Sequence, residues 1–565
     1  MDTGLDRSRA ALIRLPLRYG LLLVPAVFLA LFYFYPLVSI LAVGLAPGGQ
    51  PDLTGFAEIV TSAYYRHTLG FTLAQAALST ALTLLLALPG AYVFARYDFP
   101  AKSLLMALAT LPFVLPTVVV AAAFSALVGP RGLVNEGLMS LLGLESPPVQ
   151  LERTLAIILI VHVFYNYAVA LRIIGSYWAN QNPRMEEAAR VLGAAGWRLW
   201  WEIRLPILRP ALLAAGTLVF IFTFTSFGVV LILGGPRFAT LEVEIYRQTA
   251  NLLNLPMAAA LSLVQIGLML VMMAIYTRMQ RRTAADVVSA ASAVRPPRSR
   301  RARALVFGNL LFMAVMLFAP LLALVARSFT AGGEGFTTRY YELLFANVRG
   351  SVLFVPPMRA VGNSLVFALA TTVLAVALGL ITVYLLSQRG SRWANWLDPL
   401  FMLPLATSAV TLGFGYIIAL DEPPLNLRAS PVLIPLAHTL VAMPFVVRSV
   451  LPAKRSITPH LPEAARVLGA SPWQVWRFID LPLISRGLIV GAVFAFTVSM
   501  GEFGASLFIA RPDTPTMPVV IFRLLGQPGA ANYGQALAMS VLLMVVCAVG
   551  FILIERLRTV GMGEF

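Results

Sequence analysis

Few side chains in this sequence could carry out chemistry, and they are scattered. The 565 residues include one cysteine, Cys547, four histidines and two lysines, Lys102 and Lys454. Neither lysine follows a Gly-x-x-x-x-Gly loop, so the sequence contains no P-loop for ATP. No His, Cys, Asp or Glu residues show the spacing of metal ligands or of a nucleophile and its base. We therefore expect no enzymatic site and no metal in this chain.

Glu502 is the most informative charged residue, because it lies inside an apolar run. An ionised carboxylate within a bilayer needs a partner charge or a wet cavity. Two interpretations stay open: Glu502 balances a cationic substrate, or it makes a hydrogen bond between helices or at a gate. His162 and His438 likewise either pack with their hydrogen bonds satisfied or contact the substrate.

The composition is that of a polytopic membrane protein. Hydrophobic residues make up 59% of the chain and charged residues 12%, and the mean hydropathy is +0.83. No soluble protein of this length has that balance. The formal charge of +17 comes from arginines in short loops between apolar runs. Such arginines set membrane topology, so we do not predict a nucleic-acid partner.

Twelve apolar runs are long enough to cross a bilayer as helices, six in each half of the chain. Proline interrupts the third and ninth runs, where it either kinks a helix or marks its entry. We expect an all-α membrane protein with spans at 17–45, 68–95, 103–128, 153–176, 207–234, 257–279, 304–327, 361–387, 393–420, 431–451, 484–510 and 535–557.

Arginine concentrates in the loops on one side of these spans, and this bias marks the cytoplasmic side. Both termini then lie in the cytoplasm, together with the polar segment 281–303. That segment has the composition of a flexible tether between the halves. Its arginines could also bind anionic lipid headgroups.

One segment occurs twice, at 183–210 and at 459–486. Each copy reads Glu-Ala-Ala, three residues, Gly, nine residues, Ile-x-Leu-Pro. An acidic residue followed by strong helix formers favours the start of a helix. Each copy also contains too many apolar residues for a solvated loop. A single copy of the segment could also be an ordinary amphipathic surface helix between two spans. The motif residues are Glu187, Ala188, Ala189 and Gly193 in the first copy and Glu463, Ala464, Ala465 and Gly469 in the second.

The two halves align as a parallel repeat. Phe71 to Leu73 lies opposite Asn363 to Leu365 at an offset of 292, and after the outer loop near 131–152 the offset becomes 276. With six spans each, both halves insert in the same sense, related by a pseudo-two-fold axis along the membrane normal. We predict a first repeat at 1–280, a basic cytoplasmic linker at 281–303 and a second repeat at 304–565.

The duplicated segment resembles the EAA loop of binding-protein-dependent ABC importer permeases. The resemblance implies a type I importer fold and a bacterial inner-membrane location. In that family the loop is a cytoplasmic helical hairpin that docks on the ATP-hydrolysing subunit. It thus implies two copies of an ABC ATPase, which hold the ATP and magnesium, and a periplasmic or lipid-anchored substrate-binding protein. No cofactor is implied within this chain itself.

Fused permeases with two halves in one chain resemble the thiamine and ferric-iron importers. The stretches FTFTSFGVVLILGGPRFATLEVEIYRQ (222–248) and HVFYNYAVALR (162–172) look most like the thiamine permease. The resemblance implies thiamine or a thiamine phosphate as cargo, with ferric iron as the alternative. Polyamine and aminoethylphosphonate permeases share much of the pattern. An ion-coupled secondary transporter is the rival of another class, but such a protein has no reason to carry two EAA loops.

A polar, glycine-containing segment follows each EAA loop inside an otherwise apolar span, at equivalent positions of the repeat. Glycines there allow close helix approach or local unwinding, and a buried carboxylate needs compensation. We expect these segments to line the substrate route. The candidate route residues are Ser226, Phe227, Gly228 and His162 in the first half and Glu502, Phe503, Gly504 and His438 in the second.

Overall fold

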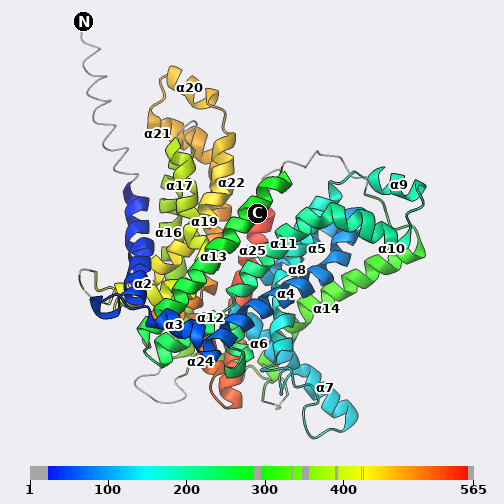
Figure 1. Ribbon diagram of the computed structural model, residues 1–565, viewed down its shortest axis with the longest axis horizontal. Coiled ribbons are helices and arrows are strands. Elements are labelled where there is room, and N and C mark those ends of the chain that lie inside the picture. The colour runs from blue at the N-terminus through cyan, green and yellow to red at the C-terminus, as the bar shows by residue number, and fades with distance from the viewer. Residues whose placement is uncertain are drawn as a thin grey trace. The chain divides into compact units, whose positions relative to one another are not determined.

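The computed structural model describes residues 23–182, 184–284, 294–332, 335–346, 355–387, 392–421, 423 and 425–557 (Figure 1). Pro183, the middle of the linker at 285–293 and both chain ends, all of which entered the sequence predictions, lie outside these residues. Every regular element in the described ranges is a helix. The predicted all-α class is confirmed.

Eleven helices within the described ranges are long and apolar enough to cross a membrane, and a bent pair raises the number to twelve if it counts as one span. This agrees with the twelve runs predicted from the sequence. The bent pair, Leu397–Leu405 and Ala409–Ala419, turns by 95°. The eleven spans are Leu23–Leu45, Ala63–Arg96, Thr117–Leu142, Leu155–Ala179, Gly196–Phe224, Leu255–Arg278, Arg300–Thr330, Pro357–Leu386, Leu433–Ser456, Pro472–Gly501 and Ala530–Arg556.

The third predicted span is not one continuous helix. Helix α5 (Lys102–Val114) is followed by its C-cap residue Leu115, and α6 (Thr117–Val128) begins after Pro116. Leu115 is extended, at φ −71° and ψ 140°, which is the conformation that a following proline imposes. The proline that matters is therefore Pro116, because Pro112 lies within α5.

The ninth predicted span is broken at the equivalent place. Helix α17 (Arg392–Met402) passes through a 3-10 turn, and α18 (Ala409–Ala419) begins after Ser408. The Ser408 hydroxyl accepts hydrogen bonds from the N–H groups of Val410 and Thr411, so it caps the new helix. Ser408 stands 292 residues after Pro116, so proline in one repeat and a serine cap in the other produce the same break.

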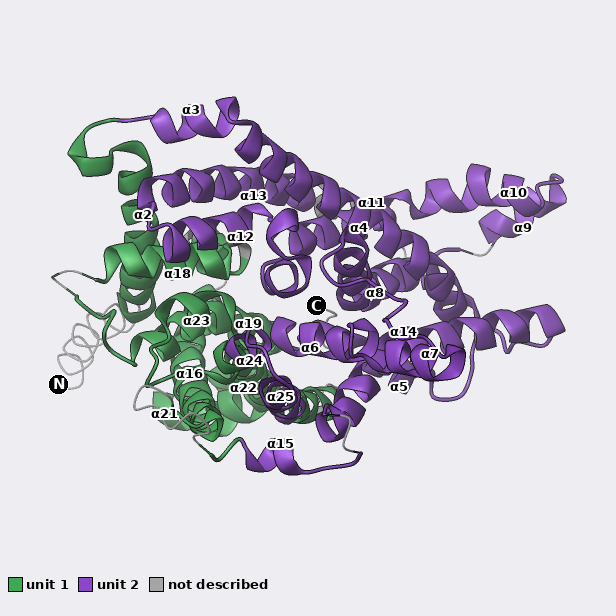
Figure 2. Cartoon of the chain, turned by 90° about the horizontal axis from the view of Figure 1, so that it is seen from below, with its two compact units in different colours: residues 1–51, 344–520, 543–565 green, residues 52–343, 521–542 purple. Residues whose placement is uncertain are grey.

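The chain forms two compact units that do not follow chain order (Figure 2). Unit 1 contains residues 1–51, 344–520 and 543–565, and unit 2 contains 52–343 and 521–542. The first span therefore groups with most of the second repeat. The repeat boundaries at 280 and 304 concern sequence similarity and stay predictions.

Close backbone approach explains these groupings. In unit 1, α2 (Tyr35–Leu45) packs on α18, where a Cβ on Gly415 would lie 3.0 Å from the Cβ of Pro36. In unit 2, α14 (Arg300–Thr330) packs on α6, and its Asn309 side chain lies beside Gly90 of α4 (Ala63–Arg96). Small residues at helix contacts are typical of membrane bundles, where van der Waals packing drives association.

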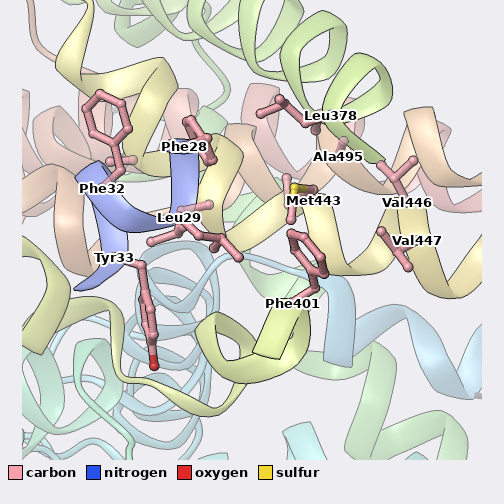
Figure 3. Close-up of a cluster of buried hydrophobic side chains, with 14 of the residues drawn as sticks. Phe28, Leu29, Phe32, Tyr33, Leu378, Phe401, Met443, Val446, Val447 and Ala495 are labelled. Atoms are coloured by element: carbon pink, nitrogen blue, oxygen red, sulfur yellow. The ribbon is translucent and has the colours of Figure 1, made fainter. Parts of the chain in front are cut away.

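The first span contributes to the core of unit 1 (Figure 3). Phe28, Leu29, Phe32 and Tyr33 are buried with side chains from α16 (Pro357–Leu386), α17, α19 (Leu433–Ser456) and α22 (Leu481–Gly501). The side chains drawn with them include Leu378, Phe401, Met443, Val446, Val447 and Ala495.

Equivalent hydrogen bonds support the parallel repeat. The Thr72 hydroxyl accepts from the N–H of Leu241, the first residue of α12 (Leu241–Tyr246), at 3.0 Å. The Ser364 hydroxyl accepts from the N–H of Met517, the first residue of α24 (Met517–Leu525), at 2.8 Å. These donors and acceptors are related by the sequence offsets of 276 and 292 residues.

The remaining helices connect or extend the spans. Part of the linker is held against the end of α4, because Arg295 makes backbone hydrogen bonds with Arg96 and Asp98. The helices that connect or extend the spans are α3 (Thr54–Thr61), α7 (Leu133–Leu142), α9 (Arg184–Val191), α10 (Gly196–Arg198), α15 (Arg339–Glu342), α20 (His460–Val467), α21 (Pro472–Val475) and α23 (Gly504–Ile509). The spans not yet labelled include α8 (Leu155–Ala179), α11 (Leu205–Phe224), α13 (Leu255–Ala284) and α25 (Ala530–Leu557).

Candidate functional site: two exposed hairpins and two span breaks

Each EAA segment is a helical hairpin at the end of its span bundle (Figure 1). In the first, α9 ends at a Schellman motif: the N–H of Gly193 donates to Arg190 O at 3.0 Å, and that of Ala194 to Ala189 O at 2.9 Å. Gly193 has φ +87°, and no atom lies within 4 Å of where its Cβ would be. The motif glycine is therefore required by backbone conformation and not by crowding.

The second hairpin repeats this geometry. The N–H of Gly469 donates to Arg466 O, and that of Ala470 to Ala465 O, both at 3.0 Å. Gly469 has φ +89°, again with open space around its Cβ position. The hairpins differ at the next helix, where Ser471 and Gln474 form a capping box in the second, whereas Ala195 occupies the N-cap in the first without a side-chain bond.

A π-helical turn connects each hairpin to its span. The first covers Leu199–Arg204 and the second Trp476–Asp480, and both run directly into helices α11 and α22. Pro206 and Pro482 follow immediately and lack an N–H group, so the regular hydrogen-bond ladder is interrupted there in any case. Single π turns often occur at functional sites.

Both hairpins expose large apolar side chains. The consecutive residues Val191 and Leu192 are 87% and 88% exposed, and their equivalents Val467 and Leu468 are each 87% exposed. Two equivalent tryptophans, Trp197 and Trp473, are also exposed. Exposed apolar patches of this kind mark interaction surfaces.

The predicted motif residues divide between this surface and the inside of the hairpin. Glu187, Ala188, Glu463 and Ala464 are exposed, beside the apolar patches. Ala189 is buried and Ala465 is partly buried, under their own hairpins. The structure therefore brings the glutamates, the first alanines and the apolar residues onto one accessible part of each hairpin.

The candidate route segments are breaks in the spans that follow the hairpins. Helix α11 ends at Phe224, and a π turn, Val230–Gly234, follows the irregular residues Thr225 to Phe227. Helix α22 ends at Gly501, and α23 restarts at Gly504. Local unwinding at Ser226 and Glu502, raised by the glycines in the sequence, is therefore present in both repeats.

Glu502 caps the helix after its break. Its carboxylate accepts hydrogen bonds from the N–H of Ala505 at 2.8 Å, and from the N–H and hydroxyl of Ser506 at 2.9 and 2.7 Å. The side chain is buried, and Nε2 of His438 lies 3.3 Å from one of its oxygens. Both oxygens are thus hydrogen-bonded within unit 1, and a contact of Glu502 with the substrate stays a prediction.

The two equivalent histidines hold these breaks. In unit 2, Nδ1 of His162 is 2.9 Å from Ser79 Oγ, and Nε2 is 2.8 Å from Ser226 Oγ. In unit 1, Nδ1 of His438 is 2.7 Å from Ser499 Oγ, and Nε2 is 2.8 Å from Ser506 Oγ. All four ring nitrogens have partners, so both histidines connect a neighbouring helix to a broken span.

No group of three His, Cys, Asp or Glu residues in the described ranges could hold a metal ion. Cys547 is buried in α25 as a free thiol. The candidate site is therefore described by its surfaces and helix junctions.

Comparison with known proteins gives the family. The model of the family "binding-protein-dependent transport system inner membrane component" matches residues 84–285 and 375–559. A thiamine transport system permease of Salmonella typhimurium (strain LT2) is 26% identical over 96% of this chain and 98% of its own. One of Brucella abortus (strain 2308) is 28% identical over 92% of each chain.

A solved chain of a bacterial alginate ABC transporter, crystallised with its alginate-bound periplasmic protein, aligns at 19% identity with a TM-score of 0.40, over 51% of this chain and all of that one. The family match covers both halves separately, so the two permease repeats are fused in one polypeptide. The chain belongs to the family of inner-membrane components of binding-protein-dependent transport systems.

Proposed function

We propose that this permease subunit of an ABC importer carries thiamine, or a thiamine phosphate, across the inner membrane. The support for this cargo is the nearly full-length similarity to proteins named as thiamine permeases, at 26–28% identity. The substrate arrives on a separate binding protein, and ATP is hydrolysed by a separate subunit.

The two exposed apolar hairpins carry the docking part of this proposal. Each presents Glu, Ala and a Val-Leu pair on one surface, and each continues through a π turn into a single span. Two ATPase copies would each engage one hairpin, and their closure would displace the hairpin and the span behind it. The candidate route residues at the two breaks lie on these same spans, so movement reaches them through one helix in each repeat.

Uptake by proteoliposomes tests the cargo. They would contain the permease and its ATPase, with the substrate-binding protein outside and ATP within. We expect radiolabelled thiamine to accumulate only with ATP, and unlabelled thiamine or thiamine phosphate to compete, whereas ferric citrate and putrescine do not. Accumulation of ferric iron in place of thiamine would reject the proposed cargo but not the importer class.

The orientation is tested separately. Cysteines replace Ser471 in the second hairpin and Leu144 in the predicted outer loop, in a Cys547→Ala background without other cysteines. We expect an impermeant thiol reagent added to spheroplasts to label the cysteine at 144 and not the one at 471. The reverse pattern would place the hairpins outside.

A further inference from the structure

Arg204 and Asp480 occupy the same position in the two repeats, 276 residues apart, and carry opposite charges. Each is the last residue of its π turn, and they are only 7% and 6% exposed. Each is also the variable residue of the Ile-x-Leu-Pro motif. Burying a charge is costly unless it is paired, so each must have a partner.

In the first hairpin the partner is Glu186, which precedes the motif glutamate. Nη2 of Arg204 lies 3.2 Å from one Glu186 oxygen, and Nη2 of Arg96, at the end of α4, lies 2.5 Å from the other. The Arg204 guanidinium also lies about 5 Å from the ring centres of Tyr92 and Trp200. Burial opposes ionisation of Glu186, but the two guanidinium groups hold the pKa of its carboxyl below the usual value.

In the second hairpin the charges are reversed. One oxygen of Asp480 lies 2.6 Å from Nζ of Lys454, in the last turn of α19, and accepts a hydrogen bond from the hydroxyl of Tyr384 at 2.9 Å. Nζ of Lys454 lies 4.5 Å from the centre of the Tyr384 ring. Tyr384 is equivalent to Tyr92 of the first repeat.

The surrounding positions change together with the charge. Lys454 is equivalent to Trp178, whose ring packs against Tyr92 and Trp200 in the first repeat. Pro462 stands where the first repeat has Glu186. Thus each repeat contains one buried ion-pair cluster at the same junction, built from different positions.

We propose that these clusters, Arg96–Glu186–Arg204 and Tyr384–Lys454–Asp480, are positioning residues that make each hairpin and its span move as one body. A π turn interrupts the regular hydrogen-bond ladder, so it would bend when a bound ATPase moves the hairpin. In the first repeat a buried ion pair crosses the turn, from Glu186 in α9 to Arg204. In the second, Lys454 in the last turn of α19 holds Asp480, so the pair closes the base of the hairpin. Both pairs resist bending because separating their members leaves a buried charge. The inference rests on the proposed docking of the ATPase.

An exposed charge on the second hairpin lacks this property. Arg477 lies in the same π turn as Asp480, but it is exposed. Exposed charges contribute little and reorganise freely. The variant Arg477→Gln is therefore the matched control for loss of a hairpin charge.

The test uses the full complex with its ATPase in proteoliposomes and an environment-sensitive fluorophore. In a Cys547→Ala background, the fluorophore is attached at position 471 to report the hairpin, or at 489 in α22 to report the span. In the parent protein and in Arg477→Gln, both labels should respond to ATP and magnesium. In Asp480→Asn the hairpin label should still respond, while the span response falls about fivefold or more.

Recovery distinguishes positioning from folding. The charge swap Lys454→Asp with Asp480→Lys should regain at least half of the span response, and the conservative Lys454→Arg should keep it. If Asp480→Asn does not assemble, Tyr384→Phe, which removes only one donor to Asp480, should give a smaller loss at position 489 with a normal response at 471.

Two results would overturn the inference. One is a normal span response in Asp480→Asn, or in Tyr384→Phe where that variant replaces it. The other is a charge-swap variant that regains none of the span response, although Lys454→Arg shows a normal span response. If instead the hairpin label of the parent protein does not respond to the ATPase, docking itself is wrong.

Discussion

The two EAA hairpins keep the same backbone geometry and differ in the chemistry that holds them. Both end their first helix with a glycine at positive φ, and both return to the membrane through a π turn. The residue that ends the turn is Arg204 in one and Asp480 in the other, each in a complete ion pair. The comparison teaches that both hairpins keep the path of the backbone and a buried ion pair at the end of the π turn. The sign of the charge on the residue that ends the turn is not kept.

Breaking the shared geometry should have the largest effect. Gly193→Val and Gly469→Val each force a β-branched residue into a left-handed conformation, which costs about 1–2 kcal/mol or more and redirects the hairpin. We expect ATP-driven uptake to be nearly abolished in both variants while the permease still folds. Uptake and ATP hydrolysis per assembled complex measure this.

Gly143→Val is the control, because Gly143 ends α7 at φ +65° in open space and belongs to neither hairpin. It should reproduce the backbone strain without the loss of coupling. Wild-type uptake in both hairpin variants would show that the shared glycine geometry does not serve docking.

Transplanting one cluster onto the other repeat sharpens the comparison. Asp480→Arg alone places a guanidinium beside Lys454 and should cost about 3–5 kcal/mol, as for a broken buried pair. Adding Lys454→Trp and Pro462→Glu supplies the first repeat's partners and should restore much of the stability and uptake. Thermal unfolding of the purified variants measures the change in stability.

The double variant Asp480→Arg with Pro462→Glu is the control, since it leaves Lys454 beside the new arginine. If the triple variant is no better than Asp480→Arg alone, the sign of the charge matters and the two clusters are not interchangeable.

The span breaks offer a third contrast, between Glu502 and its equivalent Ser226. Glu502→Gln keeps the shape but leaves a helix N–H without its acceptor, which costs roughly 1–3 kcal/mol. Ser226→Ala removes one neutral hydrogen bond to His162 and should cost about 1 kcal/mol. Unfolding temperatures should therefore fall more for Glu502→Gln.

Uptake normalised to assembled complex separates stability from transport in these variants. If Glu502 lies on the route of a cationic cargo, Glu502→Gln should also reduce uptake per complex. Normal uptake per complex would leave Glu502 as a helix cap and remove it from the route.

The smallest effect concerns the caps of the second hairpin helices. Ser471→Ala removes a capping box and should destabilise the helix starting at Pro472 by about 1 kcal/mol. Ala195→Ser introduces a capping hydroxyl in the first hairpin and should slow amide exchange of its first turn. Hydrogen exchange of residues 472–476 and 196–200 compares the two, and unchanged exchange in both would show that the caps are irrelevant.

Local patterns predicted much of this molecule. Apolar length predicted the spans, and the repeated Glu-Ala-Ala predicted a helix start, because both signals are local. The helical hairpin was implied by the resemblance to importer permeases. Glycine beside Glu502 and Ser226 indicated close helix approach or local unwinding in those spans, and the spans are interrupted there. The break after Val114 occurs at Pro116, whereas Pro112 lies within α5, because a proline within the last turn of a helix need not end it.

Long-range pairing was beyond such patterns. Arg96 meets Glu186, and Tyr384 meets Asp480, across 90 and 96 residues of sequence. The grouping of the first span with most of the second repeat likewise depends on tertiary contacts, such as that between Gly415 and Pro36. The sequence contained one signal for the clusters, the opposite charges at the variable position of the two Ile-x-Leu-Pro motifs. That signal is informative only when the partner positions are known as well.

The mass of the intact complex tests the central claim, that one chain carries two docking hairpins. The permease is co-expressed with the ATP-binding subunit of its transport system, purified with bound nucleotide and measured by native mass spectrometry. We predict one permease chain with two ATP-binding subunits. A complex with a single ATP-binding subunit, or a permease that retains none, would contradict the account.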